Sequence, residues 1–298
     1  MASARASKNL TRIYPAIFAL ALLLPEALPQ ASSVASQAAQ RELGTQADSR
    51  PRRRRPPDPF AGQERIRALI VTGGCCHDYA GETKVIMDMM ASEAPVNWTV
   101  ALETEGRSTW TTTKARLYNQ PNWSEGYDIV VHNECYANVD DAEFVRTIVA
   151  GHNGGLPAVV IHCAMHSYRA LESDEWREFL GVTTRRHTRQ HRIAVQVKDA
   201  NHPVMKGFPL DWVTPMDELY VIQKLWPEAN SLAAAVHPES GDEHPIVWTN
   251  DYRGARVFGT TLGHGSATWD DPTFQDLLAR GFKWAVNWQR PEQRGAIE

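Results

Sequence analysis

The chain has 298 residues, with 35 acidic and 31 basic side chains, a net charge of -4 and 43% hydrophobic residues. These figures are typical of a globular protein with one large domain or two small ones. The charge is uneven, because residues 1–61 hold 9 basic and 4 acidic side chains, which leaves 22 basic and 31 acidic (-9) for residues 62–298. The net negative charge of residues 62–298 argues against a nucleic-acid-binding protein.

Residues 1–35 have the pattern of a secretory signal peptide. Three basic residues precede an apolar run at residues 16–24 (AIFALALLL), and small residues follow it. A run of that length cannot cross a bilayer, which takes roughly 20 residues in a helix, so we expect no stable membrane insertion. Cleavage after Ala35 satisfies the small-residue rule, and we expect an exported protein, periplasmic or secreted. An uncleaved anchor is the alternative, but Pro25 and Glu26 interrupt the apolar run.

The rest of the chain divides into three parts. Residues 36–65 are rich in Pro and Arg and show no apolar period, which predicts a disordered linker. Residues 66–289 carry all 11 His, all 4 Cys and all 10 Trp, and we expect one α/β domain there. Residues 290–298 are expected to form a tail.

The first half of this domain alternates short runs rich in β-branched residues with segments of helical spacing. This alternation predicts an α/β three-layer sandwich with a mostly parallel central sheet. The expected strands are at residues 67–72, 97–102, 127–132 and 158–162, and the expected helices are at residues 82–92 and 140–150.

The second half contains more strand-like segments, followed by a closing helix. Asp271 is a suitable N-cap before Pro272, at the first position of a helix that reaches Trp288. The expected strands are at residues 192–197, 218–222, 232–236, 245–248 and 256–262.

Reactive side chains follow the carboxyl ends of the predicted strands. In open α/β sheets this edge binds ligands, so we expect these residues to converge on one cleft. They form four clusters in chain order: Cys75, Cys76 and His77; His132, Glu134 and Cys135; His162, Cys163 and His166; and His264.

Two chemistries use this composition. The first is a divalent metal of the zinc type, held by imidazole together with carboxylate or thiolate. The second is nucleophilic catalysis by Cys163 with His166 or His264 as its base. The thiol mechanism is the weaker of the two, because a nucleophile elbow needs small residues around the nucleophile and Ile161 and Met165 are not small.

The four cysteines have several possible pairings in an exported protein. Adjacent Cys75 and Cys76 would form a strained disulfide with each other, and either can instead pair with Cys135 or Cys163. Four cysteines are too few for a disulfide scaffold, and unpaired ones would serve mainly as small hydrophobic residues.

Six ordered motifs resemble the ThuA-like family, which is named for a trehalose-utilisation protein. They are TGGCCHDYAGET (72–83), YDIVVHNECY (127–136), VVIHCAMHSYR (159–169), NHPVMKGFP (201–209), MDELY (216–220) and PIVWTNDYRGARVFGTTLGH (245–264). The resemblance covers residues 66–289 and implies a flavodoxin-like fold similar to that of class I glutamine amidotransferases. The family residues it carries over are His162, Glu218 and His264.

The resemblance also implies a role in the use of disaccharides through 3-keto sugars. Proton abstraction next to a ketone needs a base and a group that stabilises the enolate, either a metal or a protonated His. His162, Glu218 and His264 are therefore expected to act as catalytic acid/base groups or as ligands of a divalent metal, and no nucleotide cofactor is indicated.

A small carbohydrate is the expected ligand of such a site. His77 and His166 are expected near it, with Tyr168 as a further contact. The expected reaction is that of a lyase, hydrolase or isomerase. Glutaminase activity is not expected, because Ser266 stands where the amidotransferases have Glu.

Two other classes of function fit the same residues. A non-catalytic carbohydrate-binding domain would keep the cleft without a metal, and an amidohydrolase-like enzyme would require a reactive Cys163. The sequence does not define an oligomeric state.

Overall fold

The computed structural model describes residues 58–103 and 111–289, which lie in one compact unit that begins at Pro57. The expected signal peptide, most of the expected linker and the tail lie outside these residues. Residues 58–65 correct the linker prediction. Phe60 is buried and packs edge-on against Trp288, with ring centroids 6.1 Å apart, and Asp58 pairs with Arg65. The domain therefore begins at about residue 58 and not at residue 66.

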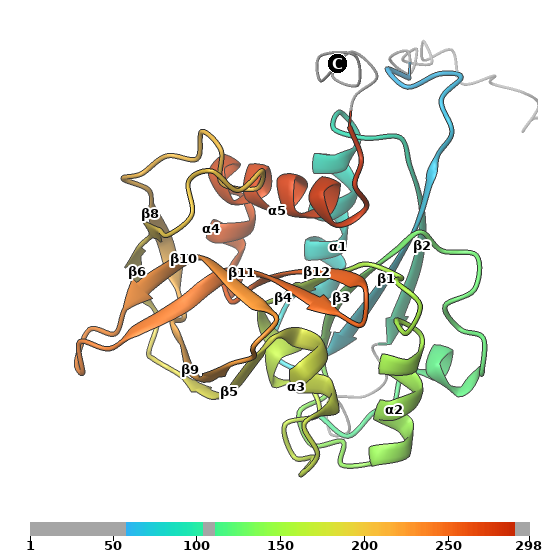
Figure 1. Cartoon of the computed structure of the whole chain (residues 1–298), viewed down its shortest axis with the longest axis horizontal. Helices are drawn as coiled ribbons and strands as arrows, with labels where there is room; N and C mark the ends of the chain where they lie inside the picture. Colours follow the sequence, from blue (N-terminus) through green and yellow to red (C-terminus); the bar gives the residue numbers. More distant parts are fainter. Residues whose placement is uncertain (1–57, 104–110, 290–298) are drawn as a thin grey trace, which may run out of the picture. The chain divides into compact units, whose positions relative to one another are not determined.

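An eight-stranded mixed sheet forms the centre of the domain (Figure 1). Its first five strands run parallel, and the last three pair antiparallel at the other end. The spatial order is β2 (Val96–Glu103), β1 (Ile66–Gly74), β3 (Ile129–Cys135), β4 (Ala158–Ile161), β12 (Ala255–Thr260), β11 (Glu243–Tyr252), β10 (Ala229–Val236) and β7 (Gln196–Val197).

The inner parallel strands are buried on both faces, which explains their sequences. β4 reads AVVI and β3 begins IVV, with every residue of both strands buried. Strands that are covered on both sides read as continuous apolar runs, because neither face meets water. The predicted strands at residues 67–72, 97–102, 127–132 and 158–162 correspond to β1, β2, β3 and β4.

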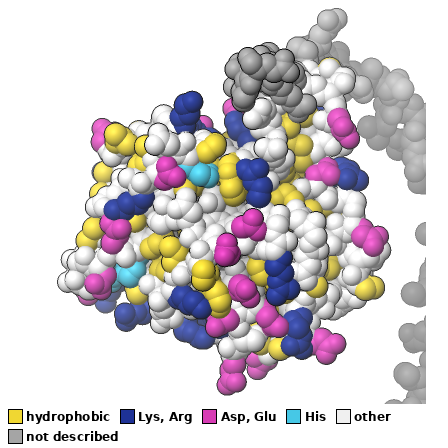
Figure 2. All heavy atoms as spheres, in the orientation of Figure 1, with side chains coloured by type: hydrophobic (Ala, Val, Ile, Leu, Met, Phe, Trp, Pro, Cys, Tyr) yellow, Lys and Arg dark blue, Asp and Glu magenta, His cyan; other side chains and the backbone are white. Residues whose placement is uncertain are grey.

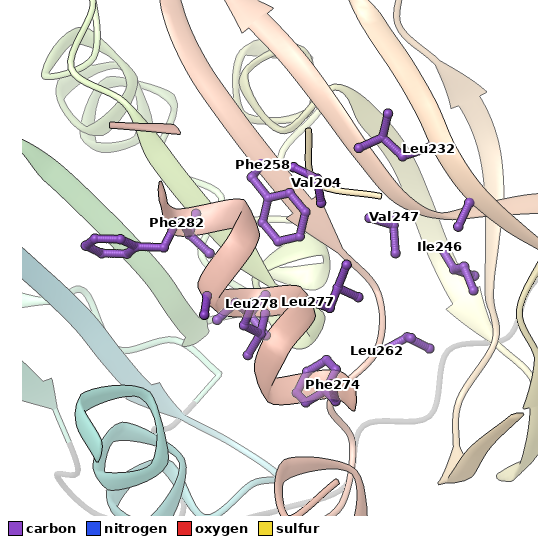
Figure 3. Close-up of a cluster of buried hydrophobic side chains, with 14 of the residues drawn as sticks. Val204, Leu232, Ile246, Val247, Phe258, Leu262, Phe274, Leu277, Leu278 and Phe282 are labelled. Carbon is purple, nitrogen blue, oxygen red and sulfur yellow. The ribbon is translucent and has the colours of Figure 1, made fainter. Parts of the chain in front are cut away.

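Helices cover both faces of the sheet and complete the three layers (Figure 1). One face carries α1 (Tyr79–Met90), α4 (Ser266–Trp269) and α5 (Pro272–Ala285), and the other carries α2 (Ala142–Ala150) and α3 (Glu175–Leu180). Figure 3 shows Phe274, Leu277 and Leu278 of α5 packed among apolar side chains of β10, β11 and β12. As expected, Asp271 caps α5 by accepting hydrogen bonds from the amides of Thr273 and Phe274.

The second half of the chain also forms two short antiparallel ribbons of two strands each. One pairs β5 (Val182–His187) with β9 (Tyr220–Leu225), and the other pairs β6 (His191–Ala194) with β8 (Val213–Asp217). The expected strand at residues 192–197 is thus divided between β6 and β7, and the expected strand at residues 218–222 begins later, so that Glu218 lies in the turn before β9. Two short 3-10 helices, η1 (Arg116–Asn119) and η2 (His162–His166), complete the elements of residues 58–103 and 111–289.

Figure 2 shows Lys and Arg side chains interspersed with Asp and Glu on the face it presents. Within residues 58–103 and 111–289, no helix has the length and apolar character needed to cross a membrane.

Candidate functional site

Three histidines lie directly beyond the carboxyl ends of parallel strands. His77 follows β1, His162 follows β4 and His264 follows β12. Parallel strands end at the same edge of a sheet, so residues that are far apart in sequence meet there. The ring centroids of His77 and His162 are 4.8 Å apart, and those of His77 and His264 are 5.1 Å apart. Each ring offers a nitrogen, and the three nitrogens all lie within 4.8 Å of one another.

The backbone at His162 turns sharply to place this ring. His162 has a φ of 44°, in the left-handed region, between β4 and η2. A residue other than glycine rarely adopts this backbone conformation, and it does so mainly where the surrounding structure requires it. The sharp turn that the sequence suggested around Cys163 is therefore centred one residue earlier, on His162.

Hydrogen bonds to backbone carbonyls fix the protonation of two of these imidazoles. His162 Nδ1 lies 2.7 Å from the carbonyl oxygen of Thr261, and His77 Nδ1 lies 3.1 Å from that of His264. Only a protonated nitrogen can donate to a carbonyl, so Nδ1 carries the hydrogen in both rings and Nε2 keeps a free lone pair. In metal-binding histidines, the ring nitrogen that does not bind the metal usually donates such a hydrogen bond.

Burial keeps both rings neutral. It lowers the pKa of His77 to about 4, and it lowers the pKa of His162 well below the usual value. A neutral imidazole is the form that binds a divalent metal, so the residues present fit such an ion at neutral pH.

Glu218 brings a carboxylate to the same place from the turn between β8 and β9. Its Oε2 lies 3.2 Å from His264 Nδ1 and 3.8 Å from His162 Nε2. The pair with Glu218 raises the pKa of His264, against the opposing effect of burial. On its other side, His264 Nε2 lies 2.6 Å from the side-chain amide nitrogen of Gln190. The site therefore combines three imidazoles with one carboxylate.

A buried aspartate holds the loop that carries His264. Asp217, at the end of β8, accepts hydrogen bonds from the amides of Gly263 (3.0 Å) and His264 (3.2 Å) and from the Thr268 hydroxyl (2.9 Å). It also accepts from the amide of Glu218 at 2.8 Å. A single carboxylate thus fixes the relative positions of Glu218 and His264.

Glu82 is a second buried carboxyl group beside the histidines. It extends from α1 with Oε1 3.9 Å from His77 Nδ1, and its Oε2 accepts a 2.8 Å hydrogen bond from Asn133. Burial raises its pKa to about 7. Glu82 lies on the Nδ1 side of His77 and does not face the free nitrogen of this ring.

An aromatic stack extends the site toward β5 and β9. His166 stacks on Tyr220 with ring centroids 4.2 Å apart, and His187 lies on Tyr220 at 5.4 Å. The Tyr220 hydroxyl is 3.4 Å from His162 Nε2, and His187 Nδ1 is 3.4 Å from Glu218 Oε2. Burial lowers the pKa of His166 to about 3, which leaves this ring neutral. His166 is therefore one ring removed from the three histidines.

His132 and Glu134 do not reach this site, contrary to expectation. Both are fully buried on the face of β3 that packs against α3. There, His132 Nδ1 lies 2.9 Å from Glu134 Oε1. Tyr118 donates to the same carboxylate at 3.0 Å, and His132 Nε2 lies 3.1 Å from His152 Nε2. These four residues form a separate polar network inside the core under α2 and α3.

Tyr168 is also placed differently from the expectation. It is 1% exposed and packs against Trp176 and Phe144 in the core, with ring centroids 5.1 and 6.3 Å away. A side chain in this position cannot contact a ligand at the strand ends. The prediction of Tyr168 as a substrate contact is therefore wrong.

Cys163 is joined to Cys135 by a disulfide, and Cys75 is joined to Cys76. A disulfide sulfur has no thiolate to attack a substrate, so Cys163 is not a catalytic nucleophile in this structure. This disulfide contradicts the predicted thiol mechanism at Cys163. The pairing of neighbouring Cys75 and Cys76, which the sequence disfavoured, is the one observed.

The predictions from sequence did not include several residues of the site. Asp217 and Tyr220 flank Glu218 within the MDELY motif, and Glu82 lies in the TGGCCHDYAGET motif. Their positions inside these motifs could have marked them. His187 and Gln190 occupy a polar segment of ordinary appearance, and only the pairing of β5 with β9 brings His187 to Glu218.

Together, the fold and the site define a class of protein: a three-layer α/β sandwich with histidines and a carboxylate at the carboxyl edge of its sheet. The family described as trehalose utilisation, ThuA, matches residues 67–285, and the chain belongs to this family. The predictions of the ThuA-like family and of an α/β three-layer sandwich with a mostly parallel central sheet are confirmed.

Solved structures show the same fold. A ThuA-like protein from Parabacteroides merdae is 23% identical with a TM-score of 0.58, and the match covers 77% of this chain and 94% of that one. A ThuA-like protein from Bacteroides uniformis is 17% identical with a TM-score of 0.60, covering 78% and 96%. A β-galactosidase from Rahnella sp. R3 matches over 76% of this chain and 32% of its own, with 13% identity and a TM-score of 0.51. No match was found among curated proteins.

Proposed function

We propose that the protein processes a sugar, a keto-glycoside or a related disaccharide derivative, at a divalent metal site formed by His77, His162 and His264 with Glu218 beside it. The observation that carries the proposal is the convergence of three imidazole nitrogens within 4.8 Å. Two of these rings are neutral and oriented by backbone carbonyls, as a metal site requires. Membership of the trehalose-utilisation family supports a carbohydrate substrate.

The metal would supply Lewis acidity, which polarises a carbonyl oxygen of the substrate. Glu218 is placed to take a proton from the carbon next to that carbonyl, because its carboxylate borders the three rings and is about nine-tenths buried. His264 Nδ1, 3.2 Å from Glu218 Oε2, would orient this carboxylate for the transfer. Asp217 fixes the positions of Glu218 and His264 relative to each other, since it accepts hydrogen bonds from the backbone amides of both residues.

Metal content of the purified, tagless full-length chain tests the metal part of this proposal. We expect about one equivalent of a transition metal in the wild type, and its loss in His162→Ala and in His77→Ala. His202→Ala is the matched control, because it removes an imidazole that packs on Trp284 in another part of the domain. Equal metal content in all four proteins would contradict a site at these residues.

Turnover of 3-keto-glycosides tests the catalytic part. We expect Glu218→Gln to lower kcat by about 10²-fold or more, as the loss of a general base does, while sugar binding persists. Full turnover in Glu218→Gln and in His162→Ala would end the assignment. Sugar binding without turnover in the wild type would instead indicate a carbohydrate-binding domain.

We propose in addition that the protein is exported. The basic start and the apolar run at residues 16–24 support this location, and disulfides persist mainly in oxidising compartments. Expression of the full chain in a bacterium followed by cell fractionation tests it. We expect a periplasmic or secreted protein whose new N-terminus lies between residues 31 and 39. An uncleaved chain in the cytoplasm would contradict export.

A further inference from the structure

The four cysteines of the chain gather in one cluster beside the histidines. Cys75 and Cys76 form one disulfide beyond β1, and Cys135 and Cys163 form a second one between the ends of β3 and β4. The Sγ atom of Cys75 lies 3.9 Å from the Sγ atom of Cys135. The two disulfides are therefore in van der Waals contact, although they form in separate parts of the sequence. We refer to these four residues as the four-sulfur cluster.

Two glycines produce this contact. Gly73 and Gly74 have φ values of 126° and 102°, and a Cβ atom at Gly74 would lie 2.2 Å from the carbonyl oxygen of Cys135. With no side chain at Gly74, the chain passes directly against β3, and the amide of Cys75 donates to the carbonyl of Cys135 at 3.3 Å. The backbone, and not a flexible side chain, fixes the distance between the two sulfurs.

Exposure to solvent decreases across the cluster. Cys76 is exposed, Cys75 and Cys163 are half-buried, and Cys135 is buried. An external thiol therefore reaches Cys76 first. Attack on Cys76 releases its partner Cys75 as a thiolate, next to the buried Cys135.

We propose that the four-sulfur cluster is a thiol–disulfide exchange site, at which the Cys75–Cys76 disulfide accepts electrons from an external thiol and passes them to the Cys135–Cys163 disulfide. This inference is independent of the sugar chemistry proposed above. Its substrate is a small-molecule or protein thiol that can approach the exposed Cys76.

The exchange begins when an external thiolate bonds to Cys76 Sγ. The Cys75–Cys76 bond breaks, and its electron pair leaves on Cys75. Cys75 then attacks Cys135, the Cys135–Cys163 bond breaks, and Cys163 leaves as a thiolate that takes a proton from water.

A second external thiol completes the exchange. Its thiolate attacks the external sulfur of the mixed disulfide at Cys76, so the two external groups leave as one disulfide and Cys76 leaves as a thiolate. Cys76 then attacks Cys75 and re-forms the Cys75–Cys76 bond, and Cys135 is released as a thiol. The sum is the oxidation of two external thiols to one disulfide and the reduction of Cys135 and Cys163 to thiols.

The position of the cluster gives the exchange a consequence for the histidines. Cys76 directly precedes His77, and Cys163 directly follows His162. Opening either disulfide removes a covalent constraint from the residue next to a site histidine. The oxidation state of the cluster is thereby linked to the geometry of the site.

A matched pair of variants tests the proposal on the full-length protein. Cys76→Ser leaves Cys75 without its partner, 3.9 Å from Cys135, whereas Cys75→Ser leaves the exposed Cys76 as the unpaired thiol. The proteins are alkylated in acid-quenched, non-reducing conditions and mapped as peptides. In Cys76→Ser we expect a Cys75–Cys135 disulfide and alkylated Cys163, at a level several-fold above that of any Cys163 labelling in Cys75→Ser.

The wild type provides a second measurement that does not depend on how a variant folds. A brief exposure to glutathione, quenched with acid and alkylated, should trap molecules with a Cys75–Cys135 bond and labelled Cys163 before full reduction. The proposal is overturned if the Cys75–Cys135 bond is absent from both Cys76→Ser and the glutathione-treated wild type. It is overturned equally if Cys163 is labelled to the same extent in both variants.

Discussion

At the scale of single residues, the buried carboxyl group of Glu82 predicts a specific pH dependence. Its pKa is about 7 in the folded protein, against an ordinary value of 4.5, because burial disfavours the charged form. The folded protein therefore holds this proton more tightly than the unfolded chain does. The stabilising contribution of the protonated group is lost as the pH rises from about 4.5 through about 7.

Glu82→Gln removes this dependence. The neutral amide still offers an oxygen to Asn133, so the hydrogen bond can persist. From about pH 4.5 to about pH 8, we expect the stability of the variant relative to wild type to rise by on the order of 3 kcal/mol at most. Urea unfolding of the metal-free proteins measures it. The exposed Glu125→Gln is the control, and parallel pH profiles for Glu82→Gln and wild type would refute the assignment.

The errors in predicting individual site residues have a common cause in strand geometry. Successive side chains of a strand point to opposite faces, so His132 and Glu134 share one face of β3 while Asn133 lies on the other and reaches Glu82. Only residues beyond the end of a strand project from the edge of the sheet. His77, His162 and His264 satisfy this condition and could be predicted, whereas residues still within β3 could not be assigned to the site.

At the scale of elements, Asp217 determines how the loop from β12 to α4 is held. Asp217→Asn keeps the size of the side chain but replaces one accepting oxygen by an amide group that cannot accept. We expect a loss in the free energy of unfolding of about 1–3 kcal/mol, because buried donors among Gly263, His264 and Thr268 lose their partner.

Hydrogen exchange measures the local effect of that change. The amides of Gly263 and His264 should exchange faster in Asp217→Asn, since they open without global unfolding. Asp270→Asn, at an exposed position beyond α4, serves as the control. Unchanged exchange at both amides would show that Asp217 does not hold the loop.

The packing of α5 on β12 makes a second prediction at this scale. A Cβ atom at Gly281 would lie 2.3 Å from Cδ1 of the buried Phe258. Alanine favours a helix by about 1 kcal/mol over glycine, but overpacking costs about 1–3 kcal/mol. Because Phe258 is enclosed, we expect Gly281→Ala to be destabilising overall, as thermal or urea unfolding would measure.

A double-mutant cycle identifies the cause of that destabilisation. Phe258→Leu removes the ring that the new methyl group would meet, so Gly281→Ala should cost less in the Phe258→Leu background. Equal costs in both backgrounds would exclude a clash between these two positions.

The elements that could be predicted are those with a long apolar signal. β1, β3, β4, α1, α2 and α5 are buried along most of their length or on one stripe, and their sequences show it. β5 reads VTTRRH with its second half exposed, and β8 reads VTPMD with a proline. Pairing with β9 and β6 determines these two strands, and a single sequence contains no sign of that pairing.

For the whole molecule, metal binding predicts a shift in thermal stability. A ligand at 100 times its Kd stabilises the folded state by about 2.7 kcal/mol. Each kcal/mol moves the Tm of a domain of this size by about 2–4 °C. We therefore expect zinc to raise the Tm of chelator-treated wild type by several degrees and to leave His162→Ala unchanged. Similar shifts in both proteins would indicate zinc binding elsewhere.

The order of strands in the sheet differs from their order in the chain, and this has a consequence for synthesis. β12 is the last of the described strands to leave the ribosome, yet it lies between β4 and β11 in the middle of the sheet. Until about residue 260 has emerged, β4 has an open edge of unpaired backbone groups, which is prone to pairing with other chains. A nascent chain halted before β12 would therefore lack both His264 and the strand that protects β4. Such truncated chains should depend on chaperones more than the complete chain does.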